Sequence, residues 1–307
     1  MIETKCLSKQ YGRVQALDQL SITVAGGEIL GFLGPNGAGK STALKILSGY
    51  LPQTSGEAFI DGLSLRQNSL RARALVGYLP ENFVAPYELF VAEYLNYRAG
   101  LKQVPRAQRQ AEVMRVMQLV GIADRSRQRF DALSKGFKQR LGVADCLLGN
   151  PPVLIMDEPF SGLDPLQRQD FRQILVSLKQ QNKAILFSSH VLPEVEDIAD
   201  RVLIIHKGKT RVAASVDELL ADHQKIIIAI DGDPQQIIGK LKGCADTLGS
   251  FDVIRDNLYS AEIAAENRNQ CLKQLLESGL AVISFSPSKR DLEDVFSDFV
   301  TLQVEDQ

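Results

Sequence analysis

The sequence predicts an α/β protein with a helical insertion and a small α+β domain at its C-terminal end. Short apolar runs alternate with longer amphipathic stretches through about the first 220 residues, which is typical of strands covered by helices. Between Pro86 and Val120 the apolar residues recur at helical spacing, and the elements beyond residue 222 follow the order βαββαβ. We therefore expect an α/β domain over residues 1–222 with a helical subdomain at about 86–149, and a ferredoxin-like accessory domain over 223–307.

Composition limits the classes of protein to which the chain can belong. Its 307 residues are 45% hydrophobic, its net charge is −2 and its pI is about 6.0, so it lacks the basic field of a typical nucleic-acid binder. Its four cysteines form no CxxC pair, which argues against a zinc site or a disulfide framework. The apolar runs are far shorter than the ~20 residues of a spanning helix, and the N-terminus lacks a signal peptide's apolar stretch. We expect a cytoplasmic protein.

Four short apolar runs are the clearest strand candidates in the first domain. Three of them lead into distinctive segments: the first into a glycine-rich turn, the second into Asp-Glu-Pro and the third into Ser-Ser-His. Because the carboxyl ends of parallel strands meet at one edge of a sheet, these segments are expected together, with the acidic strand next to the glycine-turn strand. The four runs are Glu28–Leu33, Val153–Met156, Ala184–Ser188 and Val202–Ile205.

The second domain begins after a predicted loop near Ala221–Gln224. A closing helix is expected from about Arg290 to Val300. Between them the expected elements are a strand (Lys225–Ile230), a helix opened by Asp233-Pro234, two strands (Asp252–Arg255 and Leu258–Ile263), a helix (Asn267–Ser278) and a strand (Ala281–Phe285).

A phosphate-binding loop lies between the first apolar strand and a predicted helix, Thr42–Leu47. It fits GxxxxGK[ST], in which glycines let backbone N–H groups surround phosphate oxygens and the helix adds its positive end. Lys40 is expected on the β- and γ-phosphates, and the Ser41 hydroxyl on Mg²⁺. A chance glycine turn is disfavoured by this strand–loop–helix context. The predicted nucleotide-binding residues here are Gly34, Pro35, Asn36, Gly37, Ala38, Gly39, Lys40, Ser41 and Thr42, which indicates a P-loop NTPase core.

Two carboxylates end the strand Val153–Met156. Asp157 is expected to hold Mg²⁺ through water, and Glu158 to polarise the attacking water. The alternative is a solvated acidic turn, but a phosphate loop needs an acidic partner and no better strand-end acid is present.

The segment Leu133–Arg140, LSKGFKQR, completes a resemblance to the ATPase subunits of ABC transporters, in the exporter-type branch. An LSGGQ-like loop shortly before the acidic strand distinguishes that family from other phosphate-loop enzymes. Ser134 and Gly136 match the motif, while Lys135 and Phe137 replace a glycine and the glutamine. The resemblance implies that Ser134, Lys135 and Gly136 bind the γ-phosphate of ATP held by the opposite subunit. An ordinary N-capped helix is the alternative.

Four further residues stand at positions with a role in the family, three as matches and Glu81 as a departure. The resemblance implies that Tyr11 stacks on adenine, that Asp164 lies in a loop through which the subunits sense each other, and that the switch histidine His190 contacts the γ-phosphate and helps to hold Glu158. Glu81 stands where the family more often has glutamine and is assigned to Mg²⁺ or the water. The alternatives are a surface tyrosine, a helix cap at Asp164, and a Glu81 that only opens the helical insert.

The resemblance covers residues 1–220, and the tail Asp291–Phe296 is similar to the LEDVF ending of exporter-type ATPases. It implies a dimeric, most simply homodimeric, ATPase that uses ATP and Mg²⁺, drives a separate transmembrane permease for export, lies peripherally on the inner face of the membrane and binds no nucleic acid. A soluble ABC ATPase acting on ribosomes or DNA would carry two cassettes or a long coiled coil. A regulatory ATP sensor would not need both Glu158 and His190. The cargo is not encoded here.

Overall fold

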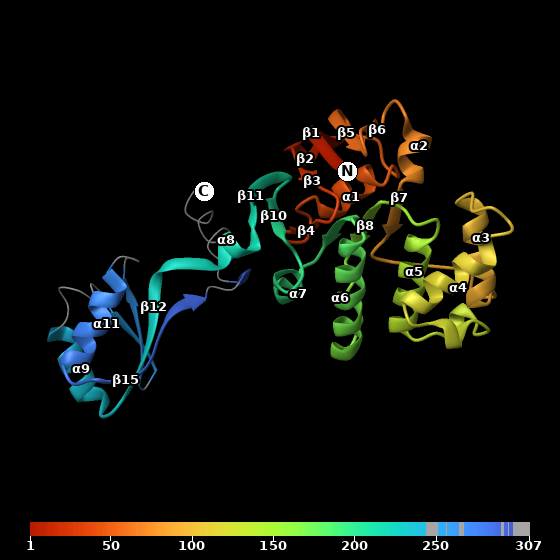
Figure 1. Ribbon diagram of the computed structural model, residues 1–307. Helices are drawn as coiled ribbons and strands as arrows, with labels where there is room; N and C mark the ends of the chain where they lie inside the picture. Colours follow the sequence, from red (N-terminus) through yellow and green to blue (C-terminus); the bar gives the residue numbers. More distant parts are fainter. Residues whose placement is uncertain (244–250, 256, 264–266, 290–291, 294, 297–307) are drawn as a thin grey trace. The chain divides into compact units, whose positions relative to one another are not determined.

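The computed structural model divides into two compact units, Met1–Val216 and Asp217–Gln307 (Figure 1). It describes all of the chain except residues 244–250, 256, 264–266, 290–291, 294 and 297–307. Within the described part, no helix combines the length and the apolar character needed to cross a membrane.

The first unit is built around a six-stranded sheet in the order β11-β10-β4-β9-β8-β7. All neighbouring strands are parallel except β10 and β11. Three central strands are buried at every residue, as expected for strands covered on both faces. The four predicted strands are confirmed. The strands are β4 (Ile29–Leu33), β7 (Val76–Leu79), β8 (Val153–Asp157), β9 (Ala184–Ser188), β10 (Arg201–His206) and β11 (Lys209–Ser215).

The predicted adjacency of the acidic and phosphate-loop strands is wrong. Strand β9 pairs with both β4 and β8 and separates them. The reason lies in the connection: helix α6 (Pro165–Gln180) returns the chain from β8 to its immediate parallel neighbour, as crossover connections usually do. Consequently Ser188 and the following Ser189-His190 end between the phosphate loop and Asp157.

A second, antiparallel sheet that the sequence did not reveal packs over the phosphate-loop helix. Its core order is β2-β1-β5-β6, and β3 pairs with β1. Buried residues of β1, β2 and β5 form one apolar cluster with α1 and with one face of the parallel sheet. Helix α1 is thereby fixed between the two sheets. The elements are β1 (Ile2–Tyr11), β2 (Val14–Leu20), β3 (Thr23–Val24), α1 (Lys40–Leu47), β5 (Ser55–Ile60) and β6 (Leu63–Ser64).

The predicted helical subdomain is confirmed and consists mainly of α3 (Val91–Leu101), α4 (Arg109–Leu119) and α5 (Lys135–Leu147), which gather beside β7 in Figure 1. Short helices α2 (Ser69–Ala74) and α7 (Leu192–Glu196) complete the unit. Helix α5 packs against β7 as well as against α3 and α4, so it joins the helices to the sheet.

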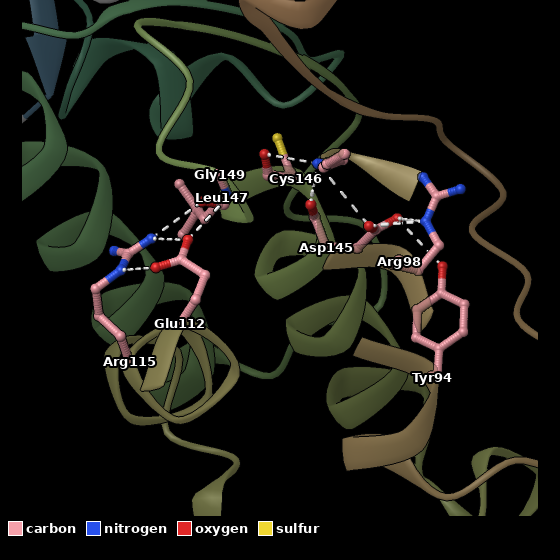
Figure 2. A network of polar contacts seen from close by, with 9 residues as sticks. Tyr94, Arg98, Glu112, Arg115, Asp145, Cys146, Leu147 and Gly149 are labelled. Carbon is pink, nitrogen blue, oxygen red and sulfur yellow. Dashed lines mark hydrogen bonds and ion pairs between the residues drawn. The ribbon is translucent and has the colours of Figure 1, made fainter. Parts of the chain in front are cut away.

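A polar network, buried at Tyr94 and Asp145, joins the three helices of the subdomain (Figure 2). The Asp145 carboxylate accepts hydrogen bonds from Tyr94 Oη at 3.1 Å and from Arg98 Nε at 2.9 and 3.0 Å. Glu112 accepts from Arg115 Nε at 2.7 Å and from the Gly149 amide at 2.8 Å. These contacts tie α3 to Asp145 in the last turn of α5, and α4 to Gly149, which follows the end of α5.

The second unit has the predicted βαββαβ order, and its antiparallel sheet has the ferredoxin-like order β13-β14-β12-β15. Three isoleucines of β12, Ile226, Ile228 and Ile230, face a core that the two helices cover. Its elements are β12 (Ala221–Asp231), α9 (Pro234–Gly243), β13 (Phe251–Arg255), β14 (Leu258–Glu262), α11 (Arg268–Glu277) and β15 (Ala281–Lys289).

One expectation at the start of this unit is wrong. The segment 221–224 is not a loop but the beginning of β12, because Ala221 pairs with Lys289 of β15. A helix, α8 (Val216–Leu220), precedes it instead. Most of the predicted closing helix, 290–300, lies outside the described residues.

Candidate nucleotide site

The phosphate loop follows β4 and has a backbone that only glycine accommodates at two positions. Gly34 and Gly39 have φ angles of 155° and 110°, and a Cβ at either would lie 2.4 Å from a carbonyl oxygen, of Ile205 or Ala16 respectively. The loop is closed by a hydrogen bond from the Ala38 amide to the Pro35 carbonyl at 3.1 Å. The close packing therefore fixes the loop against β10 and β2.

Lys40 is the first residue of α1 and is 7% exposed. Its Nζ donates to the carbonyl oxygens of Gly34 at 2.6 Å and Pro35 at 3.3 Å, inside the curve of the loop. Burial lowers the pKa of the Lys40 ammonium. The carboxylates that oppose this decrease are, in order of effect, Glu158, Asp157 and Glu81. The lysine thus faces the three acidic residues predicted for the site, and the half-buried Ser41 and Thr42 follow it on α1.

The two acids at the end of β8 are held by a hydroxyl from β9 and an imidazole from the segment after it. Ser188 Oγ donates to Asp157 Oδ1 at 2.6 Å and accepts from the Glu158 amide at 3.0 Å. Glu158 adopts a left-handed backbone, with φ of 51°, so the extended strand conformation ends at this residue. His190 Nδ1 lies 2.7 Å from Glu158 Oε2. The predicted pair of Glu158 and His190 is therefore in direct contact.

The segment Leu133–Arg140, called the signature segment from here on, contains the start of α5 at Lys135. Ser134 is the N-cap, and its Oγ accepts from the Phe137 amide at 3.4 Å. A Cβ added to Gly136 would lie 2.2 Å from Gln167 Oε1, and one added to Gly162 would lie 2.2 Å from Lys135 Cε. The signature segment therefore packs on the Ser161–Asp164 loop and the first turn of α6.

The remaining predicted residues lie at the edges of this region. Asp164 is the N-cap of α6 and accepts from the Gln167 amide at 2.8 Å, so it does act as a helix cap. Tyr11 ends β1 and is 46% exposed, with Lys9 Nζ 5.2 Å from its ring centroid. Glu81 is exposed in the turn after β7.

Two polar residues that support the site were missed from the sequence. Ser188 is fully buried between the two acids, and Gln139 Nε2 donates to the Pro159 carbonyl at 2.9 Å, which ties α5 to the segment after Glu158. The only signal for Ser188 was its place immediately before Ser189-His190. Gln139 lies in the quoted segment Leu133–Arg140, but no role was assigned to it, because a glutamine on a helix is ordinarily exposed.

Comparisons with known proteins agree with this geometry. The family model described as ABC transporter matches residues 17–161. An uncharacterised ABC transporter ATP-binding protein of Synechocystis sp. is 38% identical over 96% of this chain and 83% of its own length. The bacitracin transport ATP-binding protein BcrA of Bacillus licheniformis is 32% identical over 96% of each chain.

A solved structure of an ATP-binding subunit of an ABC transporter aligns with a TM-score of 0.66 and 30% identity, over 71% of this chain and 91% of that one. The aligned part of this structure thus has the same fold as the corresponding part of the chain. The chain therefore belongs to the ABC transporter family, as an ATP-binding subunit that hydrolyses ATP.

Proposed function

We propose that two copies of this chain close on two MgATP molecules and drive a separate membrane permease in export. The observation that carries the proposal is the lateral separation of two half-sites in one chain. Lys40 follows β4, whereas Ser134 begins a helix that packs on β7. With β9 and β8 between them, β4 and β7 are about 14 Å apart at the usual strand spacing. Ser134 is thus better placed for a nucleotide on a second copy.

Within each site, the residues divide the work by chemistry. Lys40 and the loop amides bind the phosphates, and Tyr11 offers a flat face to the base. Ser41, Asp157 and Glu81 supply hard oxygen atoms of the kind that Mg²⁺ prefers; when bound, the cation offsets phosphate charge. An ion of this kind is held mainly by nucleotide, one or two carboxylates and water.

Glu158 is the proposed general base. Its Oε2 is held by His190, which leaves Oε1 to orient a water molecule toward the γ-phosphate. Asp157 and Glu158 have different side-chain partners, Ser188 and His190, so one strand end supplies a proposed metal-binding acid and a proposed water-binding acid. Asp164 and the signature residues Ser134, Lys135 and Gly136 complete the neighbouring subunit's site.

The helical subdomain is the proposed permease-docking surface, on the cytoplasmic side of the membrane. Four apolar side chains of the segment 84–97 are exposed, at 66%, 60%, 40% and 57% for Val84, Tyr87, Phe90 and Tyr97. Clustered exposed apolar residues are typical of interaction surfaces. The name of the BcrA relative, a bacitracin transport protein, favours a transport partner and export.

Co-purification tests this assignment. A tagged chain should recover a multi-span membrane protein from native membranes, and the double variant Tyr87→Glu/Tyr97→Glu should lose it while retaining ATP binding. A matched control, Leu276→Glu, alters a residue that is 55% exposed in the second unit and should keep the partner. Recovery of ribosomes instead, or equal recovery by both variants, would contradict the proposal.

A further inference from the structure

The buried carboxylate of Glu194 lies outside the proposed set of nucleotide-binding and catalytic residues. It belongs to the short helix α7 and is 2% exposed. Its Oε2 accepts from Ser189 Oγ at 3.2 Å, and its Oε1 lies 3.2 Å from Arg168 Nη1 in an ion pair that lacks hydrogen-bond alignment. Burial raises the pKa of this carboxyl, although Arg168 and Ser189 oppose the rise. A buried acid with one loosely aligned cation is a weak source of stability.

The Arg168 end of this ion pair leads to the Ser161–Asp164 loop. Arg168 lies in the first turns of α6, and its Nε donates to the Leu163 carbonyl at 3.1 Å. Its guanidinium therefore contacts the loop and Glu194 at the same time. Because the guanidinium is planar and rigid, a displacement of the Leu163 carbonyl alters the Nη1–Oε1 contact as well.

The Ser189 end leads to the catalytic pair. Ser189 is 1% exposed and immediately precedes His190. Its hydroxyl accepts from the Val191 amide at 3.0 Å, so it is bonded to the backbone on the far side of His190 while it donates to Glu194. The backbone that carries the imidazole is thus held through Ser189, and the imidazole in turn holds Glu158 at 2.7 Å.

We propose that Arg168, Glu194 and Ser189 are positioning residues that couple the Ser161–Asp164 loop to His190. The coupling runs from the Leu163 carbonyl through Arg168 to Glu194, and from there through Ser189 to the backbone of His190. The inference rests on the proposed roles of His190, Glu158 and the intersubunit loop. It adds an in-chain route by which docking of a second subunit on the loop aligns Glu158 in the subunit that carries it.

A neighbouring ion pair provides a matched control. Arg172 Nη1 contacts Asp197 Oδ2. This ion pair also joins α6 to the end of α7, but it lies outside the proposed route through Leu163, Arg168, Glu194 and Ser189. Glu194→Gln and Arg168→Gln should lower kcat about fivefold or more, the range of ordinary coupling energies, with the ATP dissociation constant within about twofold of wild type. Asp197→Asn should leave both unchanged. The double variant Arg168→Gln/Glu194→Gln should lose no more than the larger single loss, because either change interrupts the same route.

The result that overturns the coupling is a wild-type kcat in both single variants, an equal loss in Asp197→Asn, or additive losses in the double variant. Thermal unfolding of each protein identifies any variant that fails to fold. If an Arg168 or Glu194 variant fails to fold, Ser189→Ala interrupts the route at its other end by removing a single oxygen atom. A wild-type kcat in Ser189→Ala would count equally against the proposal. Glu158→Gln is measured alongside: if it hydrolyses ATP normally, the proposed site fails, whereas an inactive Glu158→Gln with normal Glu194 and Arg168 variants overturns the coupling alone.

Discussion

Two pairs of carboxylates, Asp145 and Glu112 on α5 and α4 and Asp157 and Glu158 at the end of β8, differ in the kind of side chain that holds them. Asp145 and Glu112 are matched by arginines, with Arg98 on one and Arg115 on the other (Figure 2). Asp157 and Glu158 are instead held by a serine hydroxyl and an imidazole.

The comparison shows how one domain uses the same functional group for two purposes. Carboxylates paired with guanidinium groups have their charge offset internally and join helices together. Carboxylates held by a hydroxyl or an imidazole are oriented without a guanidinium group on them, which leaves oxygen atoms able to bind a metal ion or a water molecule. Lys40, whose pKa is influenced by these acids, also donates to the Gly34 carbonyl of the phosphate loop, so its ammonium group is placed to bind phosphate.

The largest effect is expected from Glu158→Gln. Removal of the general base should lower kcat by about 10²- to 10⁴-fold, while ATP binding persists and the protein accumulates as an ATP-bound dimer. The unfolding free energy should change by less than about 1 kcal/mol, because the glutamine amide oxygen can still contact His190. Steady-state ATPase assays and light scattering with ATP check both points. Lys40→Ala serves as the control that should lose nucleotide binding. Full hydrolysis by Glu158→Gln would contradict the assignment of a catalytic role to this carboxylate.

Asp145→Ala should show the opposite pattern. It leaves Arg98 and Lys102 without their buried anion, and breaking a buried pair from one side costs about 3–5 kcal/mol. Urea unfolding measures the loss, and the ATPase rate per folded molecule should remain near that of wild type. Asp124→Ala, which removes an exposed partner of Arg125, should cost at most about 1 kcal/mol. Equal costs for the two variants would show that burial does not distinguish these pairs.

Glu112→Gln gives the smallest effect and a defined pH dependence. The hydrogen bonds from Arg115 hold the pKa of Glu112 below its ordinary value. A depressed carboxyl pKa contributes stability above the unfolded-state value of about 4.3, and the contribution is lost as pH falls through the lower folded-state value. Wild type should exceed Glu112→Gln by about 1 kcal/mol at neutral pH, and the difference should shrink below about pH 4. A difference that does not vary with pH would show that the charge is not involved.

The sequence predicted those parts of the molecule that depend on local pattern. Continuous apolar runs predicted β4, β8, β9 and β10, and the glycine spacing predicted the phosphate loop. The antiparallel sheet was missed because β1 has a mixed burial pattern and a register irregularity between Lys5 and Ser8, so no clean alternation is visible.

Other features depend on contacts between distant segments. The position of β9 between β4 and β8 follows from the crossover through α6, not from the apolar content of any strand. Glu194 and Arg168 each sit on a helix at a position that, taken alone, is typical of a solvated face. Their pairing is visible only once α6 and α7 are in place.

The central claim, that each nucleotide is enclosed by two chains, is tested most directly by mixing two inactive variants. Lys40→Ala lacks the phosphate-binding lysine, and Ser134→Trp blocks the signature segment, so neither protein alone should hydrolyse ATP. In a mixed dimer the phosphate loop of one chain meets the intact Ser134 of the other. An equimolar mixture should therefore recover about a quarter of the wild-type rate per chain, since about half of the dimers are mixed and each has one complete site. A mixture as inactive as its components, or a Ser134→Trp protein with a wild-type rate at every dilution, would contradict the account.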